Sequence, residues 1–93
     1  MYGIVVSARA KKALKKYRKS GTFPISKFDR AVECLRRGEA LPATYKDHAL
    51  HGNLAVFREF HIASDLLVHY ERNDKLRIIT IVKVGTHGEL FGE

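Results

Sequence analysis

Apolar residues recur with a helical period in the first half of the chain. Between residues 8 and 19 they occupy positions i, i+3, i+4 and i+7, and basic residues fill most of the rest; the apolar set is Ala10, Ala13, Leu14 and Tyr17. Ser7 is a suitable N-cap for this segment, and Gly21 is a suitable end. The pattern predicts an amphipathic helix over residues 8–19 with a dense cationic face.

A second helical period follows Pro24, a residue type often found near the start of a helix, and ends before Gly38. Its apolar positions are Ile25, Phe28, Ala31, Val32 and Leu35. Because only a few residues join the two predicted helices, we expect them to form an antiparallel hairpin. Their apolar stripes then need a third surface on which to be buried.

Segments rich in β-branched and aromatic residues are typical of strands. One precedes the first helix and three follow residue 53; the four are residues 2–6, 54–62, 66–72 and 76–84. Short polar connections between the last three predict antiparallel pairs. The last segment is nearly continuous in apolar residues, which indicates a central strand whose partly open face is reached by Arg77 or Lys83.

The order strand, helix, helix, strand, strand, strand predicts the α+β class. We expect two N-terminal helices packed on one face of a small, mainly antiparallel four-stranded sheet, in a single domain over residues 1–93. The connection between Gly38 and Asn53 has no periodicity, and it carries Lys46, Asp47, His48 and His51. Loops of this length are usually functional or disordered. Tyr45 and Leu50 favour an ordered loop held against the domain.

Composition narrows the class of partner. Seventeen Lys and Arg against ten Asp and Glu give a formal net charge of +7, which produces a field that attracts polyanions. Nucleic acid is therefore the leading expected partner, followed by an acidic protein or an anionic membrane surface. The single cysteine, Cys34, excludes an internal disulfide and is typical of a reducing compartment. Because no apolar run approaches the roughly 20 residues that span a bilayer, we expect a soluble, cytoplasmic protein.

Histidines and charged residues concentrate in residues 45–65 and 83–91. The first segment contains three of the five histidines, and the second places another one near Lys83. Because histidine has an unperturbed pKa of about 6.5, this clustering favours general acid and base chemistry beside a bound anion. The alternative is a set of ordinary solvated or half-buried histidines, which is the interpretation we favour for His69 in the middle of a strand.

A metal site is a further interpretation of the same histidines. The chain has one cysteine and no His-Glu-x-x-His motif, and loop spacing alone rarely makes a zinc site. No metal and no cofactor are therefore expected.

Three motifs carry a resemblance to a known family. They are Tyr-Lys-Asp-His-Ala-Leu-His-Gly at 45–52, Arg-Glu-Phe-His-Ile-Ala-Ser-Asp-Leu-Leu at 58–67 and Gly-Thr-His-Gly-Glu-Leu-Phe at 85–91. As a set they resemble the YafQ-type toxins of bacterial type II toxin–antitoxin systems, in the RelE/ParE superfamily. The resemblance implies a RelE-like fold with two helices on a small antiparallel sheet. It also implies an endoribonuclease that cleaves mRNA in the ribosomal A site and is inhibited by a cognate antitoxin. The implied partners are mRNA, the ribosome and an antitoxin, with a hetero-oligomer as a possible complex.

Carried over residue by residue, the resemblance places the family's site on His48, His61, Asp65, Lys83, His87 and Phe91. Lys46 and Arg58 are further expected RNA contacts. Two positions depart from the family pattern. Leu66 stands where an aromatic residue, often tryptophan, follows the aspartate, and Lys83 is a point charge where relatives carry a bidentate guanidinium.

These residue types suit metal-free RNA cleavage, in which the 2′-hydroxyl attacks the neighbouring phosphate. A base must take the hydroxyl proton while an acid protonates the departing 5′-oxygen, and each transfer typically contributes about 10²- to 10⁴-fold. Asp65 or His48 is the candidate base, and His87 is the candidate acid. Lys83 and Arg58 are candidates to stabilise the charge of the phosphorane. The ring of Phe91 is suited to stacking on a base.

Two other function classes remain open. A ParE-like toxin of the same fold would inhibit gyrase without catalysis, and a basic nucleic-acid-binding module would share the charge. The histidine set argues against the first, because a steric inhibitor needs no proton donors. Fold alone does not decide between these classes.

Overall fold

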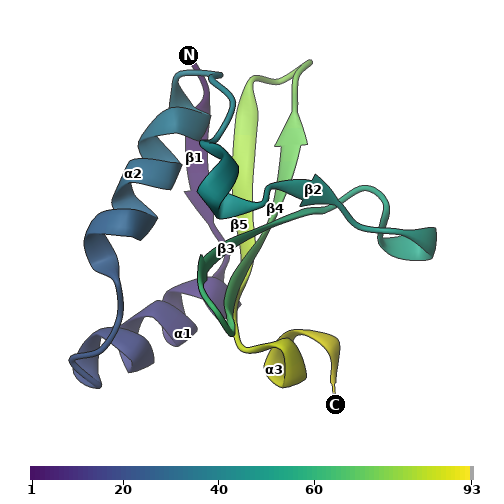
Figure 1. Ribbon diagram of the computed structural model, residues 1–93. Helices are drawn as coiled ribbons and strands as arrows, with labels where there is room; N and C mark the ends of the chain where they lie inside the picture. The colour runs from purple at the N-terminus through teal and green to yellow at the C-terminus, as the bar shows by residue number, and fades with distance from the viewer. Residues whose placement is uncertain (93) are drawn as a thin grey trace.

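The computed structural model describes residues 1–92, which form a mixed sheet with two helices on one face and a short helix on the other (Figure 1). The elements in chain order are β1 (Gly3–Val6), α1 (Ala8–Lys19), α2 (Ile25–Arg36), β2 (His48–Ala49), β3 (Arg58–Ala63), β4 (Leu66–Asn73), β5 (Ile78–Gly85) and α3 (His87–Phe91). Two single-turn 3₁₀ helices, Ala43–Tyr45 and Gly52–Leu54, flank β2. The α+β class and the bounds of α1 are confirmed.

The sheet has five strands in the order β1-β5-β4-β3-β2, with β1 parallel to β5 and the other pairs antiparallel. The expectation of four strands is therefore wrong by one. The additional strand, β2, is only two residues long, which is too short for an alternating pattern to be visible in sequence. β1 and β5 are parallel because α1 and α2 return the chain to the same end of the sheet.

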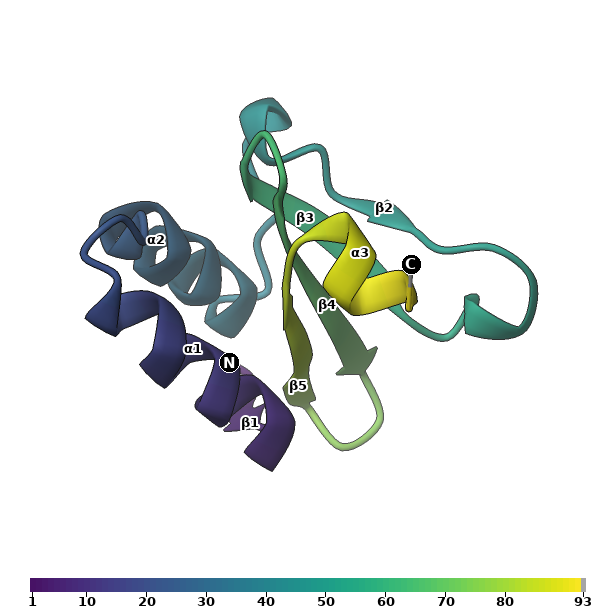
Figure 2. The ribbon, with the colours of Figure 1, turned by 90° about the horizontal axis from the view of Figure 1, so that it is seen from below.

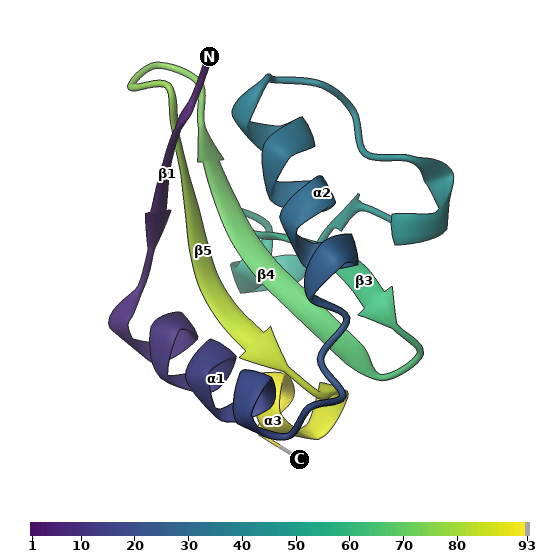
Figure 3. The same ribbon diagram turned by 90° about the vertical axis from the view of Figure 1, so that its left-hand side faces the viewer.

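The main core lies between α1, α2 and one face of the sheet. It includes Ala10 and Leu14 from α1, Phe28 and Leu35 from α2, and Phe60, Val68, Tyr70 and Ile81 from the strands. The two helices do not form the expected antiparallel hairpin. α2 runs along the strands, whereas α1 crosses the lower end of the sheet (Figure 3). Each helix buries its apolar stripe against the sheet, so neither stripe needs the other helix.

Helix α3 covers part of the opposite face, which was expected to be open, and it was not predicted. Seen from below, α1 and α2 lie on one side of β5, and α3 lies on the other (Figure 2). α3 begins with a capping box in which the Thr86 hydroxyl accepts from the Glu89 backbone N–H while the Glu89 carboxylate accepts from the Thr86 backbone N–H. A helix of five residues is too short to produce a recognisable apolar period.

A bulge in β5 decides which way Lys83 points. Tyr70 pairs with Ile81, but the next residue of β4, His69, pairs with Lys83, so Val82 is an extra residue in β5. Strict alternation from Ile81 would place Lys83 under α1 and α2. The Ser7 hydroxyl donates to the Val82 carbonyl oxygen at 2.7 Å and holds the bulge in place. Lys83 therefore shares a sheet face with His69.

The long connection before β3 is ordered. Tyr45 is 3% exposed and its hydroxyl donates to the Lys27 carbonyl oxygen at 2.9 Å, and Leu50 is also buried, as expected. β3 begins at Arg58 rather than at residue 54, because residues 52–57 form a turn. No helix within residues 1–92 is long and apolar enough to cross a membrane.

Candidate active site on the open sheet face

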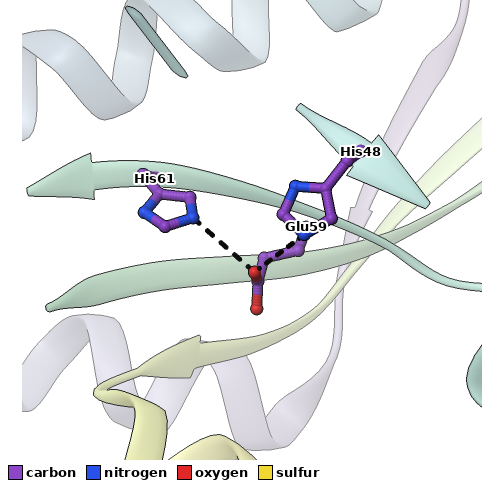
Figure 4. A group of neighbouring side chains, drawn as sticks. All are labelled: His48, Glu59 and His61. Carbon is purple, nitrogen blue, oxygen red and sulfur yellow. Dashed lines mark ion pairs between the residues drawn. The ribbon is translucent and has the colours of Figure 1, made fainter. Parts of the chain in front are cut away.

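The centre of the open face is Glu59 of β3, a residue that sequence reasoning missed. Its side chain is almost fully buried, and three histidines contact it, of which Figure 4 shows His48 and His61. His69 Nε2 lies 2.8 Å from Oε1, while His48 Nε2 and His61 Nε2 lie 3.2 Å and 3.6 Å from Oε2. A buried carboxylate requires compensation by hydrogen bonds or charge, and the histidines supply it.

His69 of β4 is neutral and donates to Glu59. Burial lowers the pKa of His69, and this effect outweighs the opposing effect of its hydrogen bond with the Glu59 carboxylate. A neutral imidazole next to an ionised carboxylate must place its proton on the facing nitrogen, here Nε2. His69 is therefore part of the site's hydrogen-bond network rather than an isolated structural histidine.

His48 of β2 has both ring nitrogens engaged. Nδ1 lies 2.7 Å from the Lys46 carbonyl oxygen, and since a carbonyl only accepts, Nδ1 carries a proton. Nε2 faces the Glu59 carboxylate at 3.2 Å. The Lys46 carbonyl thus holds the His48 ring with Nε2 turned toward Glu59.

His61 of β3 is less buried than His69, and its ring lies 6.1 Å from the ring of His48. Burial lowers the pKa of His61; Glu59 raises it, and the positive charge of Lys46 lowers it further. A histidine with a lowered pKa is neutral at pH 7 and can accept a proton.

α3 supplies the second half of the site. The Phe91 ring stacks on His87 with centroids 5.0 Å apart and meets the ring of His69 edge-on at 5.1 Å. The His87 backbone N–H donates to Asp65 Oδ1 at 3.0 Å, so the turn between β3 and β4 holds the start of α3. Lys83 completes this side because it stands opposite His69 in the adjacent strand.

Glu89 anchors α3 to α1 from outside the site. Its carboxylate accepts from the Tyr17 hydroxyl and lies 3.4 Å from Lys16 Nζ, in addition to its bond with the Thr86 backbone. The Thr86 backbone N–H, followed by the Tyr17 hydroxyl, lowers the pKa of Glu89 to about 2. A Cβ at Gly85 would lie 2.9 Å from this carboxylate and 3.1 Å from the Glu89 Cβ, so a larger residue there would displace the Glu89 side chain.

Arg58 is not brought to the site. It alternates with Glu59 along β3 and therefore points to the helix-covered face, where its Nε donates to Asp47 at 3.2 Å and to the Tyr70 hydroxyl at 3.3 Å. Tyr70 also donates to Asp47 at 2.8 Å. These contacts fix Asp47, the residue before His48, so Arg58 holds the loop rather than facing a phosphate at the site.

The remaining sequence-predicted residues lie together. His48 and His61 contact Glu59, Lys83 stands opposite His69, Phe91 links His69 to His87, Asp65 holds the His87 backbone, and Lys46 lies beside His61. The signal for Glu59 was its place in β3: Phe60 and Ile62 are apolar, so the residues at 59 and 61 share the other face. A carboxylate two positions before His61 was visible in the sequence.

His48, Glu59 and His61 are also suited to hold a metal ion. Their ligand atoms all lie within 4.8 Å of one another. Two imidazoles and one carboxylate form a common zinc donor set that leaves a coordination position open. The Lys46 carbonyl beside Nδ1 of His48 is the kind of outer contact that orients a metal-binding imidazole through its other nitrogen. The donor set fits, and the expectation of no metal stays a prediction.

Comparison with solved structures defines the class of protein. A metal-bound toxin from Helicobacter pylori superposes with a TM-score of 0.89 and 35% identity, over 98% of this chain and 100% of that chain. The toxin in the Escherichia coli DinJ-YafQ complex superposes with a TM-score of 0.86 and 28% identity, over 99% of this chain and 100% of that chain. The fold is thus that of a small bacterial toxin.

The sequence then gives the family. Residues 2–92 match the family described as the bacterial toxin of type II toxin-antitoxin system, YafQ, and the chain belongs to that family. The mRNA interferase toxin YafQ of E. coli strain K12 is 42% identical over 52 residues. That alignment covers 56% of this chain and 54% of the relative, so the chain spans about half the length of the curated relatives that it matches.

The Glu59 network predicts a measurable response of two histidines. Replacing Glu59 with Gln keeps the shape but removes the charge that raises the pKa values of His61 and His69, so both values should fall further below about 6.5. NMR titration of the histidine ring signals measures this, with Glu39→Gln, an exposed carboxylate outside the cluster, as control. A rise in either pKa would contradict the network.

Proposed function

We propose that this chain is an endoribonuclease toxin that cleaves mRNA on the ribosome without a metal ion. The observation that carries the proposal is the buried Glu59 carboxylate, contacted by three histidines on the sheet face that Lys83 also reaches. Proton donors, proton acceptors and a cation gathered on one open surface suit phosphoryl transfer from the 2′-hydroxyl. The name mRNA interferase, given to the E. coli relative, supports the same activity.

We assign the base to His61 and the acid to His87. His61 has a lowered pKa and is neutral at pH 7, and the Glu59 carboxylate 3.6 Å away stabilises the imidazolium that forms after proton transfer. His87 comes from α3, which packs against β4 and β5, and His61 lies on β3, so a phosphate bound between the two side chains would have one of them on each side. In-line displacement needs its base and acid on opposite sides of the phosphorus. Asp65 then positions α3 through the His87 backbone, and His48 lies beside Glu59 with its Nε2 3.2 Å from the carboxylate.

Lys83 and Phe91 complete the assignment. Lys83 is a cation on the same face as the histidines and would offset the charge that develops on the phosphorane. Phe91 is 37% exposed, and its inner contact with His87 leaves one ring face available to stack on a base of the RNA.

The toxin activity implies an inhibitor, and the charge of α1 suggests its chemistry. Basic residues cover the exposed surface of this helix, among them Lys11, Lys12, Lys15, Arg18 and Lys19. An acidic antitoxin segment would neutralise this surface. The related E. coli toxin was crystallised in a complex with DinJ.

The central test is cleavage of a defined mRNA with and without programmed ribosomes, read by primer extension. The wild-type protein should cleave within the reading frame when ribosomes are present. His87→Ala should lower the single-turnover rate by about 10²-fold or more while ribosome affinity hardly changes, because the acid acts only in the transition state.

His51→Ala is the matched control, since His51 is an exposed histidine outside the Glu59 network. It should cleave at the wild-type rate. Full activity of His87→Ala would remove it as the acid. Intact message together with inhibition of gyrase supercoiling would move the protein to the non-catalytic branch of the superfamily, and intact message with RNA binding alone would make it a binding module.

Lys83 gives a second prediction. Lys83→Ala should lower the cleavage rate, whereas Lys83→Arg should keep or raise it, because a guanidinium offers two parallel donors to phosphate oxygens. Both variants are measured by single-turnover cleavage and by ribosome binding. Loss of activity in Lys83→Arg with normal ribosome binding would instead indicate that Lys83 acts as a neutral base, which arginine cannot do.

Metal binding is a second candidate function, favoured by the donor set of His48, Glu59 and His61 and by the metal-bound relative from H. pylori. A bound ion would occupy the nitrogen atoms that we assign to proton transfer. We therefore expect Zn²⁺ to inhibit cleavage and EDTA to leave it unchanged. Calorimetry with Zn²⁺ should show binding that is lost in His48→Gln and kept in His51→Gln. Loss of cleavage on chelation, with ribosomes intact, would show that the metal is required.

A further inference from the structure

A pocket of about 320 Å³ adjoins His61 at the end of β3. Its lining comes from α2, the loop before β2, the end of β3 and the turn after it, and consists of Lys27, Thr44, Lys46, His61, Ala63 and Ser64. His61 is thus shared between the pocket and the Glu59 network. Lys83 lies on β5, two strands away from β3, so the pocket is on the far side of His61 from Lys83.

The pocket is positively charged and has no acidic lining residue. Lys27 and Lys46 contribute the two charges, and within residues 1–92 neither forms an ion pair. Thr44 and Ser64 add two hydroxyl donors. The charge of Lys46 also acts on His61, where it opposes protonation. The pocket therefore places two positive charges and two hydroxyl groups, and no negative charge, around the space beside the assigned base.

The two lysines are held by the fold rather than by a counter-ion. Lys27 Nζ lies 5.2 Å from the centroid of the Tyr45 ring, and the Tyr45 hydroxyl donates to the Lys27 carbonyl oxygen at 2.9 Å. Lys46 follows Tyr45 directly and has a left-handed backbone with a φ of 52°. The buried Tyr45 thus fixes the position of both cations relative to β3.

We propose that this pocket binds a phosphodiester of the RNA strand next to the linkage that is cleaved. The proposal rests on the proposed function and adds to it a second phosphate site, distinct from the one served by Lys83. Lysine ammonium groups and hydroxyls are common donors to phosphate oxygens. Because phosphate contacts position a strand without reading its bases, the pocket sets which linkage lies against His61 for any sequence.

The test is a scan with short oligoribonucleotides made resistant to cleavage by 2′-deoxy substitution. Each carries one uncharged methylphosphonate at a different linkage, and binding is measured by fluorescence anisotropy at low salt. For the wild-type protein, a methylphosphonate should weaken binding at two of the linkages, which we call the sensitive linkages. In the double variant Lys27→Gln, Lys46→Gln, the loss of affinity caused by a methylphosphonate at one of these linkages should fall from about tenfold to nearly none. The slope of log K against log salt concentration should also become shallower by about 0.7 for each lost phosphate contact.

Two controls separate a local contact from the general effect of charge. Lys75→Gln removes one charge, half of what the double variant removes, from the turn between β4 and β5 and should leave both sensitive linkages as they are in the wild type. Lys27→Arg combined with Lys46→Arg keeps the charges and should keep the pattern. If the glutamine variant retains both sensitive linkages, or weakens binding no more than Lys75→Gln does, the pocket is not a phosphate site.

Failure of the proposed function gives a different result. If the variant shows the linkage-specific loss but the wild-type protein cleaves no mRNA, the phosphate site is supported and the nuclease assignment is wrong. If the protein cleaves mRNA but the methylphosphonate penalties are equal in the wild type and the glutamine variant, the nuclease assignment is supported and the pocket is not a phosphate site. If the wild-type protein binds no oligonucleotide at low salt, the pocket is not a phosphate site, and the cleavage assay with ribosomes alone decides the nuclease assignment.

Discussion

The charge of one buried carboxylate organises the functional face of this protein. Glu59 lies in the interior of the sheet, where an ionised group without partners would be strongly unfavourable. Three histidines from three different strands supply the partners, so β2, β3 and β4 must keep their register for the charge to be tolerated. The histidines proposed to carry the chemistry are therefore the same ones that make the burial of Glu59 possible. Stability and chemistry cannot be varied independently here.

Contacts outside the open face fix the two segments that carry the site residues. Arg58 and Tyr70 reach Asp47 from the helix-covered face and thereby fix the loop that carries His48. Tyr17 of α1 reaches Glu89 and fixes the helix that carries His87 and Phe91. Neither contact touches the open face. Preorganisation of the site thus relies on residues whose own surroundings belong to the core and to the first helix, which leaves the open face free for a ligand.

The sequence predicted α1, α2, the α+β class and most of the histidine cluster, because apolar periods of twelve residues and motif spacing are strong local signals. It did not predict β2, α3 or the helix crossing. β2 and α3, with two and five residues, are too short to show a periodic pattern. The angle between α1 and α2 depends on where the sheet offers apolar surface to each helix. Glu59 was not predicted because a carboxylate in a strand is usually exposed, and its burial depends on histidines from two other strands. Arg58 was predicted to face the RNA, but it is adjacent to Glu59 in β3 and its side chain therefore points to the opposite face of the sheet.

The bulge at Val82 changes how relatedness should be judged at this site. Residue identity along β5 does not by itself tell whether a lysine at this position faces the site. The side chain of Lys83 points to the open face because Val82 is an extra residue in the strand. A homologue that lost this residue would keep every functional side chain in its sequence and yet bury a lysine beneath the first helix. When relatives are aligned, an insertion or deletion in β5 therefore says more about the direction of the lysine side chain than a substitution does. Evolution can exchange lysine for arginine here far more easily than it can change the length of the chain.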